Sequence, residues 1–266
     1  MVLKNAGSKS RYLTLLDPYF SWLVDGESAY GEPCVAGGST LIRLAEKYPH
    51  LRLLANDLNP YVTAFWEAVS RKETAEALCE RLKEIPTLQS RAEFLHHEPH
   101  DLIERAYGAV VIARTSRSGI VRAKMFNGGR DETHLGKHLL EHWNPDFMCR
   151  EIRRYHQLVA GRLVVSQVDA RLFAESHLRI PMFVDPPYVK EGHKLYRCSM
   201  SLDEHRALAT TLKRARAAVI TYDHCPEVLK MYAGCRIDQF PTSYSADRTP
   251  SNNYQLKQLN ELIVII

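Results

Sequence analysis

Short apolar runs recur along the chain, separated by longer stretches in which apolar residues return every three or four positions. Apolar runs bounded by turn residues or acids predict buried strands, and the three-to-four spacing predicts amphipathic helices. The predicted strands lie near 30–35, 51–57, 163–169, 180–184, 219–223 and 261–266. The predicted helices lie near 12–23, 39–45, 60–69, 131–160, 170–177, 203–215 and 226–232. Strands that alternate with helices predict an α/β fold with a largely parallel sheet.

The middle of the chain differs from its two ends. Residues 71–107 are rich in charge and have helical spacing without a strand signal, and the apolar run 109–113 fits either a helix or a strand. We therefore expect a mostly helical insert over 71–160, between the two parts of a sheet-containing domain formed by 1–70 and 161–266.

Part of this insert is strongly basic. Residues 114–130 contain four arginines and one lysine and no acid, with polar turn residues between them. An uncompensated basic hairpin is typical of contacts with DNA phosphates or guanine, and a solvated basic loop is an equally good interpretation. The candidate DNA contacts are Lys4, Arg114, Arg117, Arg122 and Lys124.

Composition narrows the class of protein. The 266 residues are 45% hydrophobic and 25% charged, as is ordinary for a globular protein. No apolar run suits a transmembrane helix, and the start of the chain lacks the apolar core of a signal peptide. The six cysteines include no C-x-x-C pair, so we expect neither a disulfide framework nor a metal site. A formal charge of +4 permits a nucleic-acid partner without requiring one.

The most distinctive stretch is Asp185-Pro186-Pro187-Tyr188, which follows the predicted strand 180–184. A carboxylate at the carboxyl end of a core strand lies where open α/β sheets bind ligands. The prolines have no N–H and stiffen the backbone, so the carbonyls remain fixed acceptors beside the tyrosine ring. This set suits a planar substrate that carries an amino group. A plain strand end with a surface tyrosine is the alternative.

A second candidate site comes from the first predicted strands. The strand near 30–35 leads into a turn of small residues, including Gly37 and Gly38, that precedes a predicted helix. Asp57 ends the next predicted strand, 19 residues beyond Gly38. An acid at this place in a Rossmann-like unit accepts hydrogen bonds from ribose hydroxyls. Because the turn lacks G-x-G-x-x-G spacing, S-adenosylmethionine is a better candidate than a dinucleotide.

Asp-Pro-Pro-Tyr resembles the catalytic motif of the Dam-type, D12 class adenine-specific DNA methyltransferases. The resemblance covers nearly the whole chain, because the other motifs occur in the same order. They are Lys4 to Lys9, Glu32 to Ser39, Asn56 to Asn59, an insert, and then Asp185 to Tyr188. The sequence departs from the usual pattern at Asn5, Ser8, Cys34 and Ala170, and in the small-residue turn 36–38.

The resemblance implies a Rossmann-like S-adenosylmethionine-dependent methyltransferase domain with an inserted target-recognition domain. It implies methylation of adenine N6 in double-stranded DNA, with the base flipped out of the duplex. The implied catalytic residues are Asp185, Pro186, Pro187 and Tyr188. The Asp185 carboxylate and the Pro186 carbonyl would each accept an N–H of the amine, and Tyr188 would stack on the base. The implied cofactor-binding residues are Asn5, Lys9, Val35, Gly37, Gly38, Asp57, Asp169 and Asp185.

Two other functions fit the same residues. One is a DNA-binding protein on a catalytically decayed methyltransferase scaffold, which the changes at Asn5 and Cys34 suggest. The other is methylation of cytosine N4, RNA or a protein glutamine, whose amino groups fit the same acceptors. For the adenine methyltransferase we expect a cytoplasmic enzyme in a bacterial or phage-infected cell. We expect no metal, and a monomer rather than a dimer.

Overall fold

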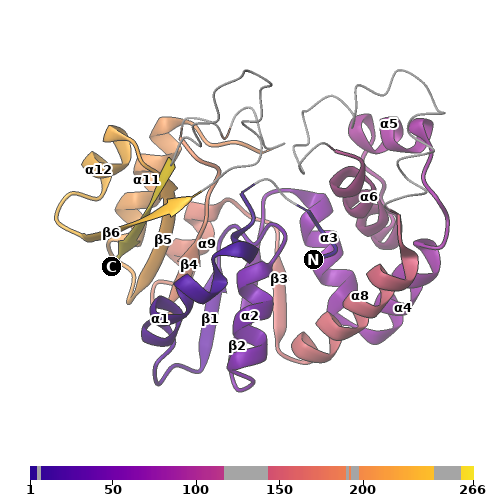
Figure 1. Ribbon diagram of the computed structural model, residues 1–266, viewed down its shortest axis with the longest axis horizontal. Helices are drawn as coiled ribbons and strands as arrows, with labels where there is room; N and C mark the ends of the chain where they lie inside the picture. The colour runs from indigo at the N-terminus through magenta and orange to yellow at the C-terminus, as the bar shows by residue number, and fades with distance from the viewer. Residues whose placement is uncertain (5–6, 117–142, 190–191, 193–197, 243–258) are drawn as a thin grey trace, which may run out of the picture.

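The computed structural model describes residues 1–4, 7–116, 143–189, 192, 198–242 and 259–266. Within these residues, seven strands form one sheet (Figure 1). Their spatial order is β3 (Leu163–Ser166), β2 (Arg52–Asn56), β1 (Ala29–Glu32), β4 (Met182–Val184), β5 (Ala218–Asp223), β7 (Leu259–Ile265) and β6 (Arg236–Thr242). The first five strands in this order are parallel, whereas β7 runs antiparallel to both β5 and β6. The predicted Rossmann-like α/β fold is confirmed.

The direction in which the sheet grows changes at β1. The chain adds β2 and β3 on one side of β1, and then returns to add β4 and β5 on the other side. Gly31 of β1 pairs with Met182 of β4 across this boundary. Ligands of open α/β sheets bind where the strand order reverses, beside the carboxyl ends of the strands. The switch point between β1 and β4 is therefore the expected place for a site.

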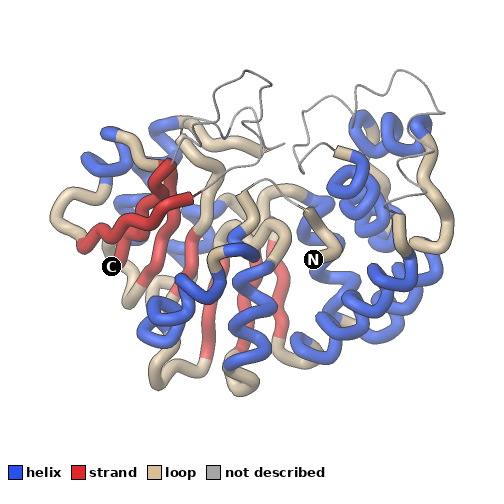
Figure 2. The backbone as a smooth tube through the Cα atoms, in the orientation of Figure 1, coloured by secondary structure: helices blue, strands red, loops and turns tan. Residues whose placement is uncertain are grey.

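Helices cover both faces of the sheet (Figure 2). One face carries α1 (Leu13–Leu23), α2 (Ser39–Lys47) and α3 (Pro60–Ser70), and the other carries α9 (Ala170–Ser176), α11 (Leu202–Leu212) and α12 (Pro226–Met231). In β4, Phe183 packs in the core of the first face, whereas Met182 and Val184 pack in the core of the second. Successive strand residues point to opposite faces, so a buried strand such as β4 is apolar throughout.

A helical lobe lies beside β3 and α3, at the right of Figure 1. Its described helices are α4 (Lys72–Arg81), α5 (Leu88–His96), α6 (Leu102–Thr115) and α8 (Pro145–Val159). The run 109–113 is helical, because it belongs to α6, whose N-terminus is capped by Asp101. Helix α6 packs along α3, and the apolar core of the lobe is continuous with the core of the first sheet face. The lobe is thereby fixed relative to the sheet.

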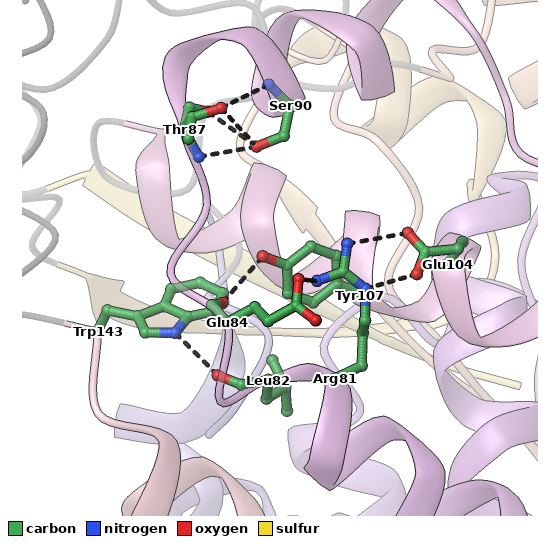
Figure 3. A network of polar contacts seen from close by, with 8 residues as sticks. All are labelled: Arg81, Leu82, Glu84, Thr87, Ser90, Glu104, Tyr107 and Trp143. Carbon is green, nitrogen blue, oxygen red and sulfur yellow. Dashed lines mark hydrogen bonds and ion pairs between the residues drawn. The ribbon is translucent and has the colours of Figure 1, made fainter.

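Side-chain contacts also tie the lobe helices to one another (Figure 3). Arg81 of α4 pairs with Glu104 of α6, and its guanidinium lies 3.9 Å from the centre of the Tyr107 ring. The Tyr107 hydroxyl donates to the Glu84 carbonyl at 3.0 Å. Trp143, just before α8, donates to the Leu82 carbonyl at 3.0 Å. These contacts hold the end of α4 against the middle of α6 and against the start of α8.

Several element boundaries differ from the sequence expectation. Strand β6 was not predicted, because its charged residues Arg236 and Asp238 interrupt any apolar run. Such a pattern suits the exposed edge of a sheet, and Pro241 is compatible with that place as well. Strand β3 ends at Ser166 rather than at Asp169. The predicted basic hairpin over 114–130 is wrong at its start, because residues 114 and 115 belong to the last turn of α6. The rest of that stretch and the predicted helix start at 131 lie in 117–142, outside the described residues.

Candidate active site

A cavity opens at the carboxyl ends of β1, β2, β3 and β4, at the switch point of the sheet. Its walls come from the segment that precedes α1, from the turns after these four strands and from residues 198–200. Except for Asn5, which lies outside the described residues, all the predicted cofactor-binding residues line this cavity. They are Lys9, Val35, Gly37, Gly38, Asp57, Asp169 and Asp185.

The turn after β1 forms the floor of the cavity. Ala36 and Gly38 both adopt positive φ angles, of 46° and 66°, so the chain reverses within a few residues. A Cβ atom on Gly38 would lie 2.0 Å from the buried Trp66 ring, so only glycine fits there. The Trp66 indole N–H donates to the Ala36 carbonyl at 3.1 Å, which fixes the position of the turn. The small residues Ala36, Gly37 and Gly38 of this turn line the cavity, and the glycines allow close approach to their backbone.

Asp57 lies at the end of β2 with its carboxylate fixed by backbone groups. Oδ2 accepts from the N–H of Ala36 at 2.9 Å, and Oδ1 accepts from the N–H of Asn59 at 2.9 Å. Burial raises the pKa of Asp57 to about 6, against the lowering by these two hydrogen bonds. A carboxylate oxygen can accept more than one hydrogen bond, so each oxygen keeps capacity for a ligand hydroxyl.

The neighbouring Asn56 is fully buried and organises this edge of the sheet. Its Nδ2 donates to the carbonyls of Pro33 and Val168, both at 2.9 Å. Its Oδ1 accepts from the Ser166 hydroxyl at 2.8 Å and from the Val168 N–H at 3.0 Å. The amide therefore joins the loops that follow β1, β2 and β3. Asn56 was not among the predicted site residues, although an amide at the end of an apolar run is a signal of a buried polar contact.

Asp169 follows β3 and reaches the cavity from its other side. Its Oδ1 accepts from the N–H groups of Arg171 and Leu172 at 2.9 and 3.3 Å, so the side chain caps α9. Asp169 therefore fixes the start of a helix as well as lining the cavity.

Asp185 follows β4 and forms the centre of a cluster of charged and polar groups. Lys9 Nζ donates to its Oδ1 at 2.7 Å and to its Oδ2 at 2.8 Å. The Thr221 hydroxyl of β5 donates to Oδ1 at 2.7 Å. The Lys9 side chain is only 2% exposed, whereas that of Asp185 is 24% exposed and faces the cavity. Thr221 was not among the predicted site residues, although the stretch 221–223 resembles the pattern of the D12 class methyltransferases.

Tyr188 joins the same cluster through Lys9. The Lys9 ammonium donates to the Tyr188 hydroxyl at 2.8 Å and lies 5.0 Å from the centre of its ring. The Tyr222 ring lies 6.3 Å from the Tyr188 ring, and its hydroxyl contacts His205 Nδ1 at 2.9 Å. Burial lowers the pKa of His205 to about 4, so the imidazole is neutral at neutral pH. The buried Tyr222 ring therefore packs beside the Tyr188 ring.

The predicted DNA-binding residues are only partly described. Lys4 is exposed, whereas the Arg114 guanidinium donates to the carbonyls of Val2 and Met1 at 3.0 and 2.9 Å. Arg114 therefore ties the start of the chain to α6, and its contact with DNA stays a prediction. Arg117, Arg122 and Lys124 lie outside the described residues.

Within the described residues, no group of three or more His, Cys, Asp or Glu side chains is arranged to hold a metal ion. In the same part of the chain, none of the helices combines the length and apolar character that crossing a membrane requires.

The fold and the cavity define a Rossmann-like methyltransferase whose Asp-Pro-Pro-Tyr motif lies at the switch point of the sheet. A family model for the D12 class N6 adenine-specific DNA methyltransferase matches residues 6–245, so the chain belongs to that family. It is an adenine-specific DNA methyltransferase that uses S-adenosylmethionine, and DNA is its substrate. A comparison with curated proteins found no match.

Proposed function

We propose that S-adenosylmethionine binds in the cavity at the switch point, with its ribose on Asp57. The cofactor supplies a methyl group on a positively charged sulfur. The supporting observation is that Asp57 presents a fixed carboxylate beside the turn 35–38 and that both line the same cavity. Lys9 and Asp169 line the same cavity, so the cofactor would extend between them.

The target amine would meet Asp185 at the opposite end of this cavity. Among the described residues, Oδ1 accepts from both Lys9 and Thr221, whereas Oδ2 accepts from Lys9 alone. Oδ2 is therefore the better acceptor for one adenine N6–H, and the Pro186 carbonyl would take the other. Two fixed acceptors draw the amine toward tetrahedral geometry and direct its lone pair at the methyl group. Tyr188 would stack on the base.

The DNA would be double-stranded, and the enzyme would act as a monomer at a specific site. The amino group of a paired adenine lies inside the duplex, so the base must be flipped into the pocket. The helical lobe, 71–160, would hold the DNA beside the cavity. Lys4 supports this arrangement, because it is an exposed cation close to Arg114. Positive charge near the start of the chain favours contact with phosphates.

The observation that carries this proposal is the Lys9–Asp185–Thr221 cluster at the carboxyl end of β4. Long-read sequencing of DNA from cells that express the protein should report methylated adenine within one sequence motif. The variant Asp185→Ala should lower the methylation rate by at least about 100-fold, as for loss of a positioned catalytic group. DNA binding should stay close to that of the wild type, whereas the melting temperature should fall, because the buried Lys9 loses its nearest anionic partner.

Two outcomes would contradict the proposal. Near-normal turnover in Asp185→Ala would remove Asp185 from the chemistry. Absence of both methylation and calorimetric cofactor binding in the wild-type protein would instead indicate a catalytically decayed DNA-binding protein.

A further inference from the structure

Glu261 is a buried carboxyl group beside the proposed catalytic cluster. It lies in β7, opposite Asp223 of β5, and is 1% exposed. Its Oε2 is 3.7 Å from Lys9 Nζ, within ion-pair range but beyond a hydrogen bond. The polar side chains that face its carboxylate and lower its pKa are those of Lys9 and Tyr188. Burial of a charged carboxylate is costly, so its presence beside the cluster calls for a reason.

The charge of this cluster follows from its members. Burial raises the pKa of Glu261 to about 6, with Lys9 acting in the opposite direction, so the group is ionised above neutral pH. Lys9 therefore serves two carboxylates, Asp185 at 2.7 Å and Glu261 at 3.7 Å. Counting one cation and two anions, these three side chains carry a net charge of about −1.

A third buried carboxyl group provides a contrast. Glu32 of β1 accepts from the Tyr30 hydroxyl at 2.7 Å. Burial raises the pKa of Glu32 to about 8, so it is mostly protonated at neutral pH and adds little negative charge.

Methyl transfer makes the target amine positively charged. Its nitrogen lone pair forms a bond to the methyl carbon, and the electrons of the broken carbon–sulfur bond return to sulfur. The amine then carries the positive charge until it loses one N–H proton, for which the Asp185 carboxylate is the adjacent acceptor. A site with surplus negative charge stabilises this change, whereas a neutral Lys9–Asp185 pair does so less.

We propose that Glu261 is a positioning residue for methyl transfer, which shares the positive charge of the Lys9 ammonium with Asp185 and keeps Asp185 a strong acceptor. Without the second carboxylate, Lys9 would neutralise Asp185 alone. The target amine would then compete with a full ion pair for the same oxygens. This inference rests on the proposed role of Asp185.

The pH dependence of this cluster involves every charged group that faces it. Within the described residues these are Lys9 on the 3₁₀ helix η1 (Lys9–Arg11), Asp185 and Tyr188 after β4, and Asp223 on β5. Protonation of Glu261 at low pH should have the same effect as its replacement by glutamine.

The test uses Glu261→Gln, which removes the charge and keeps the shape. Single-turnover methylation would be measured at saturating DNA and cofactor, from about pH 5 to about pH 9. At pH 8 we expect a rate lower by roughly 10- to 100-fold, from the loss of one unit charge a few ångströms away. In a plot of rate against pH, the wild-type rate should increase with an apparent pKa near that of Glu261, about 6. The variant should lack this increase.

Two matched variants separate charge from packing. Glu261→Asp restores the charge on a shorter side chain and should recover part of the lost rate. Glu32→Gln replaces a buried carboxyl group that is mostly neutral, so its rate at pH 7 should fall much less. Calorimetric cofactor affinity in Glu261→Gln should stay within about threefold of the wild type, because the change acts on the chemical step.

Three results would overturn the inference. One is a wild-type rate and pH profile in Glu261→Gln. Another is equal rates in the Gln and Asp variants of Glu261, and the third is a rate loss in Glu261→Gln matched by an equal loss of cofactor affinity. Any of them, together with an inactive Asp185→Ala, would leave the role of Asp185 intact. An active Asp185→Ala would remove that role as well.

Discussion

Gly38→Ala tests whether the turn after β1 determines both stability and cofactor binding. Gly38 has a φ of 66°, and an added Cβ would lie 2.0, 2.7 and 2.8 Å from three atoms of the Trp66 ring. Trp66 cannot move aside cheaply, because it is fully buried and packs against Phe65 and Tyr155. Its indole also donates to the Ala36 carbonyl.

The expected cost has three parts. The left-handed backbone costs alanine about 1–2 kcal/mol, and reduced freedom of the unfolded chain offsets about 0.4–1 kcal/mol of this. Overpacking against Trp66 adds about 1–3 kcal/mol. Loss of the indole hydrogen bond adds about 1 kcal/mol. The net loss of about 2–5 kcal/mol corresponds to a melting temperature lower by roughly 10 °C for a chain of this size.

Gly161→Ala is the matched control. Gly161 has a φ of 74°, but its added Cβ would meet no atom within 4 Å. It should therefore lose only the backbone part, about 1.6 kcal/mol at most after the offset. Thermal melts of both variants and calorimetry with S-adenosylmethionine would measure stability and cofactor affinity. Only Gly38→Ala should lose affinity, because Gly38 lines the cavity. Equal melting temperatures in the two variants, or unchanged affinity in Gly38→Ala, would refute this account.

Two further predictions concern carboxyl groups. Asp57→Ala should weaken cofactor binding by about 10- to 100-fold, since hydrogen bonds to a charged group contribute about 1.5–3 kcal/mol. The rate at saturating cofactor should change less, and an unchanged calorimetric affinity would place the ribose elsewhere. The folded pKa of Glu261, about 6, lies above its ordinary value of 4.5, so this group's stability contribution is present below pH 4.5 and lost as pH rises through 6. The free energy of unfolding of Glu261→Gln, relative to that of the wild type, should therefore rise by about 2 kcal/mol between pH 4.5 and pH 7.5. Urea unfolding at both pH values would measure this change, and a difference that does not depend on pH would contradict the burial of this charge.

The sequence predicted the acids of the cavity because of a simple geometric rule. Asp57, Asp169 and Asp185 each follow a predicted strand, and the carboxyl ends of parallel strands meet at one edge of a sheet. Lys9 was placed with them only through the family resemblance, since its contact with Asp185 spans 176 residues of sequence. No local pattern encodes such a contact.

Other features depended on tertiary structure that local patterns do not contain. From its sequence alone, the run 109–113 could form a helix or a strand. In the structure it is helical and is buried between α3 and the rest of the lobe. Thr221 and Glu261 lie in paired strands, and neither was predicted as a site residue, although the stretches 221–223 and 261–263 resemble the family's pattern. Their side chains reach Asp185 and Lys9 because of the order of the strands in the sheet.

The position of β7 explains why the cluster is assembled from distant parts of the chain. β7 enters the sheet between β5 and β6, so Glu261 comes to lie in the strand next to Thr221 and near Lys9, at the start of the chain. Lys9 is almost completely buried, and burial of an ammonium is tolerated only with close anionic partners. One of these partners, Asp185, follows β4, and the other arrives with the last strand. The charge balance at the proposed catalytic aspartate therefore depends on the pairing of β7, which links completion of the sheet to the chemistry of the site.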